Sequence, residues 1–172
     1  MPYFLHLEAT HRAGNGYLLD QFINTSSNNR DDAYGGSIKN RTRTLFEVVQ
    51  AVSDEVSAET VAVRLTLMGR FMGMNDDTPE ATFGYIAQRL NEWKFSYLHL
   101  VEPAVVGTVK DENVDPWWDD IMKLMRKNYR DVMMLAGGYT RESAEQAIAS
   151  GHRPGRIRPP LHCESGSAQA LA

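Results

Sequence analysis

The segment "HRAGNGYLLDQF" at residues 11–22 brings three side chains that can do chemistry close together, namely His11, Asn15 and Tyr17. A phenol can donate a proton to a developing carbanion. An imidazole and an amide together can hold a carbonyl oxygen or an oxyanion through two hydrogen bonds. A polar turn in which Tyr17 covers the core accounts for the same residues equally well, so the segment alone leaves both interpretations open.

Two further features fit a binding site. Arg64 lies within the apolar stretch "AVRLT", where a buried cation is costly unless it meets an anion, an electron-rich ligand or a partner carboxylate, or emerges at the end of the strand. Gly137 and Gly138 lie in "AGGY" ahead of a helical pattern. Paired glycines let backbone N–H groups approach a phosphate, although the same pair also makes ordinary turns.

The elements that must position these residues alternate along the chain. Helices are predicted at 40–57, from Pro79 onward, at 117–129 and at 140–150, and strands at 3–9, 60–67, 95–101 and 131–138. Regular alternation favours parallel strands joined by helices. The four predicted units, of about 35–40 residues each, correspond to half of an eight-stranded barrel. A flavodoxin-like open sheet fits the same pattern equally well.

Residues 1–151 are therefore expected to form one domain, followed by an irregular tail at 152–172. Three prolines, Pro154, Pro159 and Pro160, exclude a central strand from that tail.

Composition narrows the class of protein. The chain has 172 residues and a formal net charge of −4, which argues against nucleic acid as a main partner. "MPYFLHLEAT" lacks the features of a signal peptide, and no apolar run reaches the length of a membrane helix. The single cysteine, Cys163, excludes an internal disulfide and fits a reducing cytoplasm, so we expect a cytoplasmic protein. Because the sequence has no CxxC or HExxH motif, we expect no metal site.

Five motifs together resemble the Old Yellow Enzyme family, the FMN-dependent NAD(P)H:flavin oxidoreductases that act as ene-reductases. They are, in the family's order and near its spacing, "NGYLLDQF", "NNRDDAYGGSIKNRTR", "VRLT", "YLHLVE" and "LAGGYT". The resemblance implies a TIM (β/α)₈ barrel, of which this chain matches about four βα units, corresponding to strands 4–7. It also implies FMN and NAD(P)H as cofactors.

The resemblance implies roles for the residues at the first motif. Tyr17 corresponds to the family's proton donor to the substrate's α-carbon. Asn15, with His11, corresponds to the pair that hydrogen-bonds the carbonyl or nitro oxygen of an activated alkene or nitro substrate. His11 matches less closely, because "HRAGN" carries one residue more than the family's usual gap.

Residues in two of the remaining motifs resemble residues that bind the flavin in the family. Arg64 resembles the arginine at the flavin's pyrimidine edge, and Gly137 and Gly138 resemble the glycine pair that binds the FMN phosphate. In the implied reaction NAD(P)H reduces FMN, and reduced FMN passes hydride to the β-carbon of an activated alkene. Arg30, Asp32 and Tyr34, in the loop motif, are expected to be structural.

The match begins near the family's fourth strand and ends near Gly151. Four units of a barrel leave open strand edges, which favour association with a second copy. The alternative is a truncated, non-catalytic remnant or interaction fragment. Read one base later, "RPGRIRPPLHCESGS" has codons for a run close to the family's "GLAAFGRPFIANPD", and we hypothesise a frameshift from about Arg153 onward, which the coding DNA tests directly.

Overall fold

The computed structural model describes residues 9–67, 70–101, 105–106, 109–110, 118–136 and 145. Its main sheet contains four parallel strands in the order β1-β2-β3-β6. The strands are β1 (Ala9–Ala13), β2 (Val61–Thr66), β3 (Tyr97–Val101) and β6 (Met133–Ala136). The predicted helix at 140–150, the glycine pair and the tail at 152–172 lie outside the described residues, apart from Glu145.

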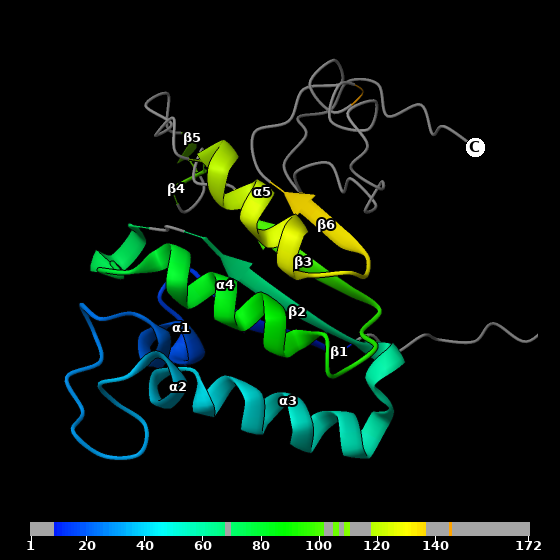
Figure 1. Ribbon diagram of the computed structural model, residues 1–172, viewed down its shortest axis with the longest axis horizontal. Helices are drawn as coiled ribbons and strands as arrows, with labels where there is room; N and C mark the ends of the chain where they lie inside the picture. The colour runs from blue at the N-terminus through cyan, green and yellow to red at the C-terminus, as the bar shows by residue number, and fades with distance from the viewer. Residues whose placement is uncertain are drawn as a thin grey trace, which may run out of the picture.

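Helices connect the strands and cover one face of the sheet. The larger ones are α3 (Arg43–Val56), α4 (Pro79–Leu90) and α5 (Trp118–Asn128), and all three lie on the viewer's side of the strands (Figure 1). Smaller elements are α1 (Leu18–Ile23), α2 (Ile38–Arg41), two 3₁₀ turns (Ala58–Thr60 and Phe71–Gly73) and a hairpin of β4 (Val105–Val106) and β5 (Val109–Lys110). Strands that follow one another in sequence order, with helices on one face, match part of a barrel. A doubly wound sheet carries helices on both faces.

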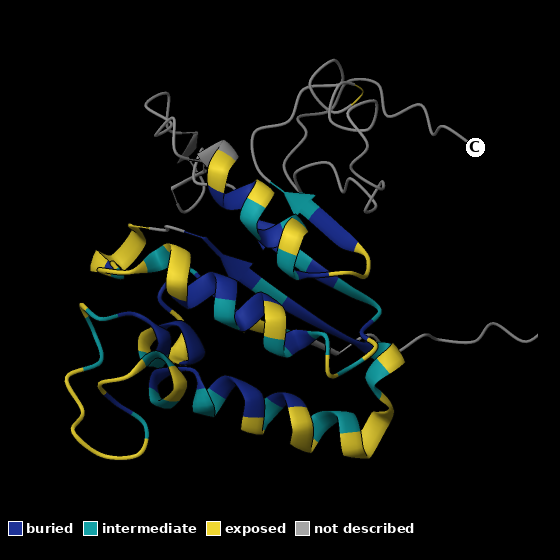
Figure 2. Ribbon diagram, viewed as in Figure 1, coloured by how far each residue is buried: buried dark blue, intermediate teal, exposed yellow. Residues whose placement is uncertain are grey.

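The hydrophobic core lies between this sheet face and the helices, as the buried inner sides of α3 and α4 indicate (Figure 2). Alternate residues of β2 face it, with Val61, Val63 and Leu65 fully buried. Helix α4 contributes the apolar face expected from its spacing, namely Phe83, Ile86, Ala87 and Leu90. Pro79 takes the first helical position, where its missing N–H costs nothing. Among the described residues, every helix is too short or too polar to cross a bilayer.

The predicted elements that fall on described residues agree with the structure to within a few residues. The strand predicted at 3–9 lies outside the described residues except for Ala9, whereas the strand that pairs with β2 is Ala9–Ala13. Each residue of β1 from Ala9 to Ala13 is in register with a residue of β2.

The loop before α2 is held by its own polar side chains, as expected for Arg30, Asp32 and Tyr34. Arg30 forms an ion pair with Asp32, and the Tyr34 hydroxyl donates a hydrogen bond to Glu47 Oε2 at 3.1 Å. A side chain at Gly35 would collide with the Arg30 carbonyl, so the tight turn requires glycine. These contacts fix the loop against α3.

One buried cation in this region escaped the sequence analysis. Arg41 is 3% exposed, and its Nη1 lies 3.3 Å from Asp76 Oδ1. It also donates to the carbonyl oxygens of Gly36 and Ile23. The guanidinium therefore ties α2 to the end of α1 and to the segment that precedes α4, a structural role.

Candidate functional site

The carboxyl ends of β1 and β2 meet at a position where only glycine fits. A Cβ on Gly14 would lie 2.7 Å from the Thr66 backbone nitrogen and would overlap the Thr66 hydroxyl. The chain then turns sharply, because Asn15 and Gly16 have φ values of 54° and 72°. This close approach directs residues 15–17 over the end of the sheet, beside α1 (Figure 1).

A buried carboxylate holds that turn in place. Asp20 accepts hydrogen bonds from the Gly16 backbone N–H at 2.9 Å and from Asn24 Nδ2 at 2.8 Å. Burial raises the pKa of Asp20, and the two hydrogen bonds oppose that rise. Tyr17 forms the N-cap position of α1, and its backbone N–H donates to the Gly14 carbonyl at 3.2 Å. The positions of Asn15 and Tyr17 are therefore set by the backbone around them.

A cavity of about 300 Å³ opens at this edge. Its lining residues are Arg12, Gly14, Asn15, Tyr17, Arg64, Phe71 and Met72. The structure thus brings together three of the residues singled out in the sequence, Asn15, Tyr17 and Arg64. The Tyr17 side chain is 53% exposed and accessible to a ligand.

Thr66 fixes the orientation of the Asn15 amide. The Thr66 hydroxyl donates a hydrogen bond to Asn15 Oδ1 at 3.0 Å, so the amide oxygen already has a partner. The Asn15 NH₂ group is left to donate to a ligand. An NH₂ group in this position can donate a hydrogen bond to a carbonyl or nitro oxygen of a ligand.

Arg64 shares its side of the sheet with Arg12. The two residues are register partners on β2 and β1, and so their side chains lie on the same face. Burial lowers the pKa of Arg64, and the positive charge of Arg12 lowers it further. Within the described parts of the chain, neither guanidinium forms an ion pair with a carboxylate. A partner carboxylate for Arg64 is therefore not found among these residues.

His11 does not line the cavity, contrary to the expectation that it lies beside Asn15. Its register partner is Val63, which belongs to the core, so His11 points to the helix-covered face. Its Nε2 is buried and has no hydrogen-bond partner among the described residues, and burial lowers the pKa of the imidazole. The extra residue in "HRAGN" moves His11 to one face and Arg12 to the other.

Sequence reasoning missed Arg12, Thr66, Phe71 and Met72. Residues 71–73 form a 3₁₀ turn in which Met72 has a φ of 58°, and no periodic pattern marks such a turn. Arg12 lies beyond the strand predicted at 3–9, so no predicted element marked it. The register of β1 with β2 places it beside Arg64.

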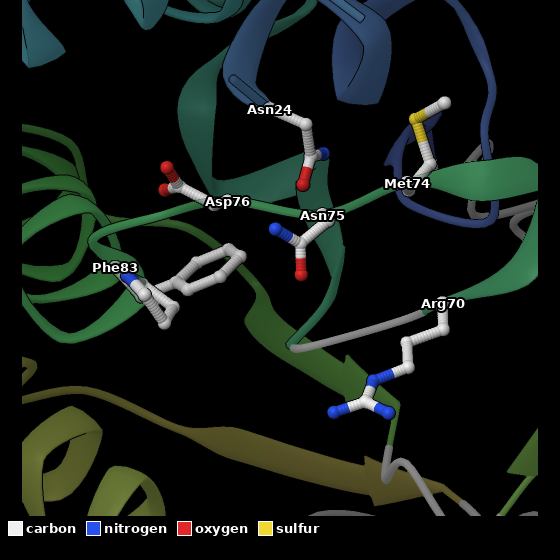
Figure 3. A pocket seen from close by; sticks show the side chains of 7 residues that line it. Asn24, Arg70, Met74, Asn75, Asp76 and Phe83 are labelled. Carbon is white, nitrogen blue, oxygen red and sulfur yellow. The ribbon is translucent and has the colours of Figure 1, made fainter. Parts of the chain in front are cut away.

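A second pocket lies between α1 and the segment that leads into α4. The side-chain amides of Asn24 and Asn75 point into it, and the guanidinium of Arg70 lies apart from them (Figure 3). Its volume of about 50 Å³ suits a few water molecules and excludes an organic ligand. No group of three or more His, Cys, Asp or Glu side chains that could hold a metal occurs in the described part of the chain.

Comparison with known proteins agrees with the resemblance seen in the motifs. Residues 10–154 match the model of the NADH:flavin oxidoreductase / NADH oxidase family. The chain is 38% identical over 138 residues to 12-oxophytodienoate reductase 1 of Oryza sativa subsp. japonica, an alignment that covers 80% of this chain and 35% of the relative. It thus spans little more than a third of that relative's length.

Solved structures match over most of the chain as well. Morphinone reductase superimposes with a TM-score of 0.77 and 32% identity, covering 87% of this chain and 39% of that chain. An Old Yellow Enzyme homologue from Zymomonas mobilis gives a TM-score of 0.74 and 35% identity, covering 84% and 40%. These comparisons confirm the partial (β/α)₈ barrel over the flavodoxin-like sheet. The chain belongs to the NADH:flavin oxidoreductase / NADH oxidase family, the Old Yellow Enzyme family that its motifs predicted.

Proposed function

We propose that this chain carries the substrate-protonating part of an FMN-dependent NAD(P)H oxidoreductase that reduces activated alkenes. The observation that carries the proposal is the convergence of Asn15, Tyr17 and Arg64 on one cavity at the carboxyl edge of parallel strands. That edge is where barrel enzymes hold their active sites. Enones are the expected substrates, and nitro compounds are a second class with the same oxygen acceptors.

Arg64 fits the flavin by its chemistry. Its guanidinium is half-buried and has no carboxylate partner among the described residues, so an electron-rich ligand would stabilise it. The pyrimidine edge of FMN has such acceptor atoms, and Arg64 would hold it there. The flavin, when bound, supplies the hydride. Gly137 and Gly138, outside the described residues, remain the predicted phosphate-binding pair.

NAD(P)H is the proposed source of reducing equivalents. Morphinone reductase, one of the structural relatives, has been solved in complex with tetrahydroNAD. At 30% identity over 87% of this chain, that likeness supports a nicotinamide cofactor here.

Two residues of this chain act on the substrate. The Asn15 NH₂ group donates to the oxygen of the activating group, which draws electron density away from the double bond. The exposed Tyr17 hydroxyl donates a proton to the α-carbon. The buried Asp20 contact at Gly16 and the Thr66 contact at Asn15 hold both donors in position before substrate binds. His11, on the opposite face, is omitted from the proposed set.

The sheet edges bear on whether the chain turns over by itself. Within the described residues, β1 and β6 each pair on one side only. Open edges favour pairing with another chain, so we propose association of two or more copies. The second candidate is a non-catalytic interaction fragment, which would bind a partner through these open edges.

Titration of the purified chain with FMN distinguishes these candidates. An enzyme retains FMN, shifts its visible absorbance and oxidises NADPH in the presence of cyclohexenone. Light scattering on the same sample measures the oligomeric state. A colourless protein that changes neither the absorbance nor the fluorescence of added FMN would reject the oxidoreductase in favour of the fragment.

A further inference from the structure

Two cations that lack a carboxylate partner in the described part of the chain share the cavity. Arg12 and Arg64 face each other across adjacent parallel strands, and both line the 300 Å³ space. Like charges at such positions repel each other unless an anion lies between or beside them. Because no carboxylate of the described residues pairs with either, a ligand is the natural source of negative charge.

The two guanidiniums differ in surroundings. Arg64 is half-buried in β2, whereas Arg12 is exposed and lies over the Tyr17 ring, with its Cζ 5.9 Å from the ring centroid. That cation–π contact fixes Arg12 beside the proposed proton donor. Arg12 therefore belongs to the substrate's end of the cavity, and Arg64 is left for the flavin.

Each polar side chain at this end of the cavity can donate a hydrogen bond to a ligand. Arg12 presents its guanidinium, Asn15 its NH₂ group and Tyr17 its hydroxyl, while the Asn15 oxygen is occupied by Thr66. Phe71 and Met72 provide the apolar part of the lining. A cavity lined by a guanidinium, further donors and two apolar side chains suits a small organic molecule that carries acceptor oxygens with negative charge.

We propose that Arg12 is a substrate-binding residue that gives this site a preference for activated alkenes bearing a carboxylate group. The proposal rests on the proposed function, since it assigns the substrate class of that same site. Arginine matches a carboxylate through two parallel N–H···O bonds, which lysine or a neutral histidine cannot provide. Strand alternation is the structural origin, because it turns Arg12 rather than His11 towards Tyr17.

Binding of benzoate and of benzamide to the purified chain tests the proposal without turnover. The two probes have nearly the same shape and differ in charge. We expect benzoate to bind at least tenfold more tightly than benzamide by calorimetry. Arg12→Gln should abolish that difference, and Arg12→Lys should retain part of it. Arg130→Gln, which removes an equal charge from an exposed position outside the cavity, should change nothing.

Equal affinities for the two probes, or no loss in Arg12→Gln, would overturn the proposal. FMN titration of Arg12→Gln and Arg64→Gln then separates the two arginines. We expect Arg64→Gln to weaken FMN binding about tenfold or more and Arg12→Gln to leave it unchanged. If Arg12→Gln weakens FMN binding as much, Arg12 is a cofactor contact and the proposal is wrong. If no form of the chain binds FMN while benzoate selectivity persists, the proposed function fails and the anion site stands.

Discussion

The two faces of β1 and β2 carry side chains of different kinds, although these side chains alternate along the same two short strands. Towards the helices, Val61, Val63 and Leu65 are fully buried in the core. Towards the other side, Arg12 and Arg64 line a cavity, and neither has a carboxylate partner among the residues that the structure describes. One face stabilises the fold and the other lines the cavity that we propose as the active site, and a shift of one residue would exchange them.

The difference between the two faces explains why the adjacent residues His11 and Arg12 have different surroundings. His11 and Arg12 are neighbours, yet one faces Val63 and the other faces Arg64. The imidazole loses solvent and has a lowered pKa, whereas the guanidinium remains exposed beside Tyr17. The side of the strand, more than the residue type, decides which of them can bind a ligand.

The largest effect should come from the core face. Leu65→Ala is expected to lower the free energy of unfolding by about 3 kcal/mol, because Leu65 is fully buried. Arg64→Met, one position away on the other face, should change it by less than about 1 kcal/mol. Urea denaturation measures both. Similar losses of unfolding free energy in the two variants would contradict the view that only the helix-covered face stabilises the fold.

Tyr17→Phe tests the chemical face. It should reduce alkene turnover about a hundredfold, the effect of losing one general acid. Reduction of bound FMN by NADPH should be unaffected, because the hydroxyl acts only on the substrate. Tyr17 is 53% exposed, so unfolding should also be unaffected. Stopped-flow absorbance separates the two half-reactions, and an equal loss in both would refute the assigned role.

Gly14→Ala tests the junction of the strands. The new methyl group would overlap the Thr66 hydroxyl, and we expect a loss of about 2 kcal/mol in unfolding free energy. Gly84→Ala is the matched control. Gly84 lies inside helix α4, where alanine stabilises by about 1 kcal/mol, and the new methyl group would lie an ordinary 3.6 Å from the Leu124 side chain of α5. A melting temperature that shifts in the same direction in both variants would contradict the close approach of Gly14 to Thr66.

The smallest effect belongs to His11. Its pKa is lowered in the folded chain from the ordinary value of 6.5, so the unfolded chain binds the proton more readily. The contribution of His11 to the free energy of unfolding is therefore fully present above pH 6.5 and is lost as the pH falls below that value. His11→Leu should weaken that pH dependence and change stability at pH 8 by less than about 1 kcal/mol. An unchanged pH profile would indicate that His11 is not desolvated.

Local patterns sufficed for much of the fold and part of the site. The β-branched run of β2, Pro79 at the start of α4 and the apolar spacing of α4 are short-range signals, and each element formed where the pattern predicts it. The motifs around Asn15, Tyr17 and Arg64 also identified residues that the structure brings to one cavity.

Tertiary structure decided the rest. Which of His11 and Arg12 faces the cavity depends on the register with β2, about fifty residues away along the chain. The burial of Arg41 depends on contacts from three separate segments. The amino-acid sequence determines such features only through long-range pairing, because a strand's side chains acquire an inside and an outside when its neighbour is in place.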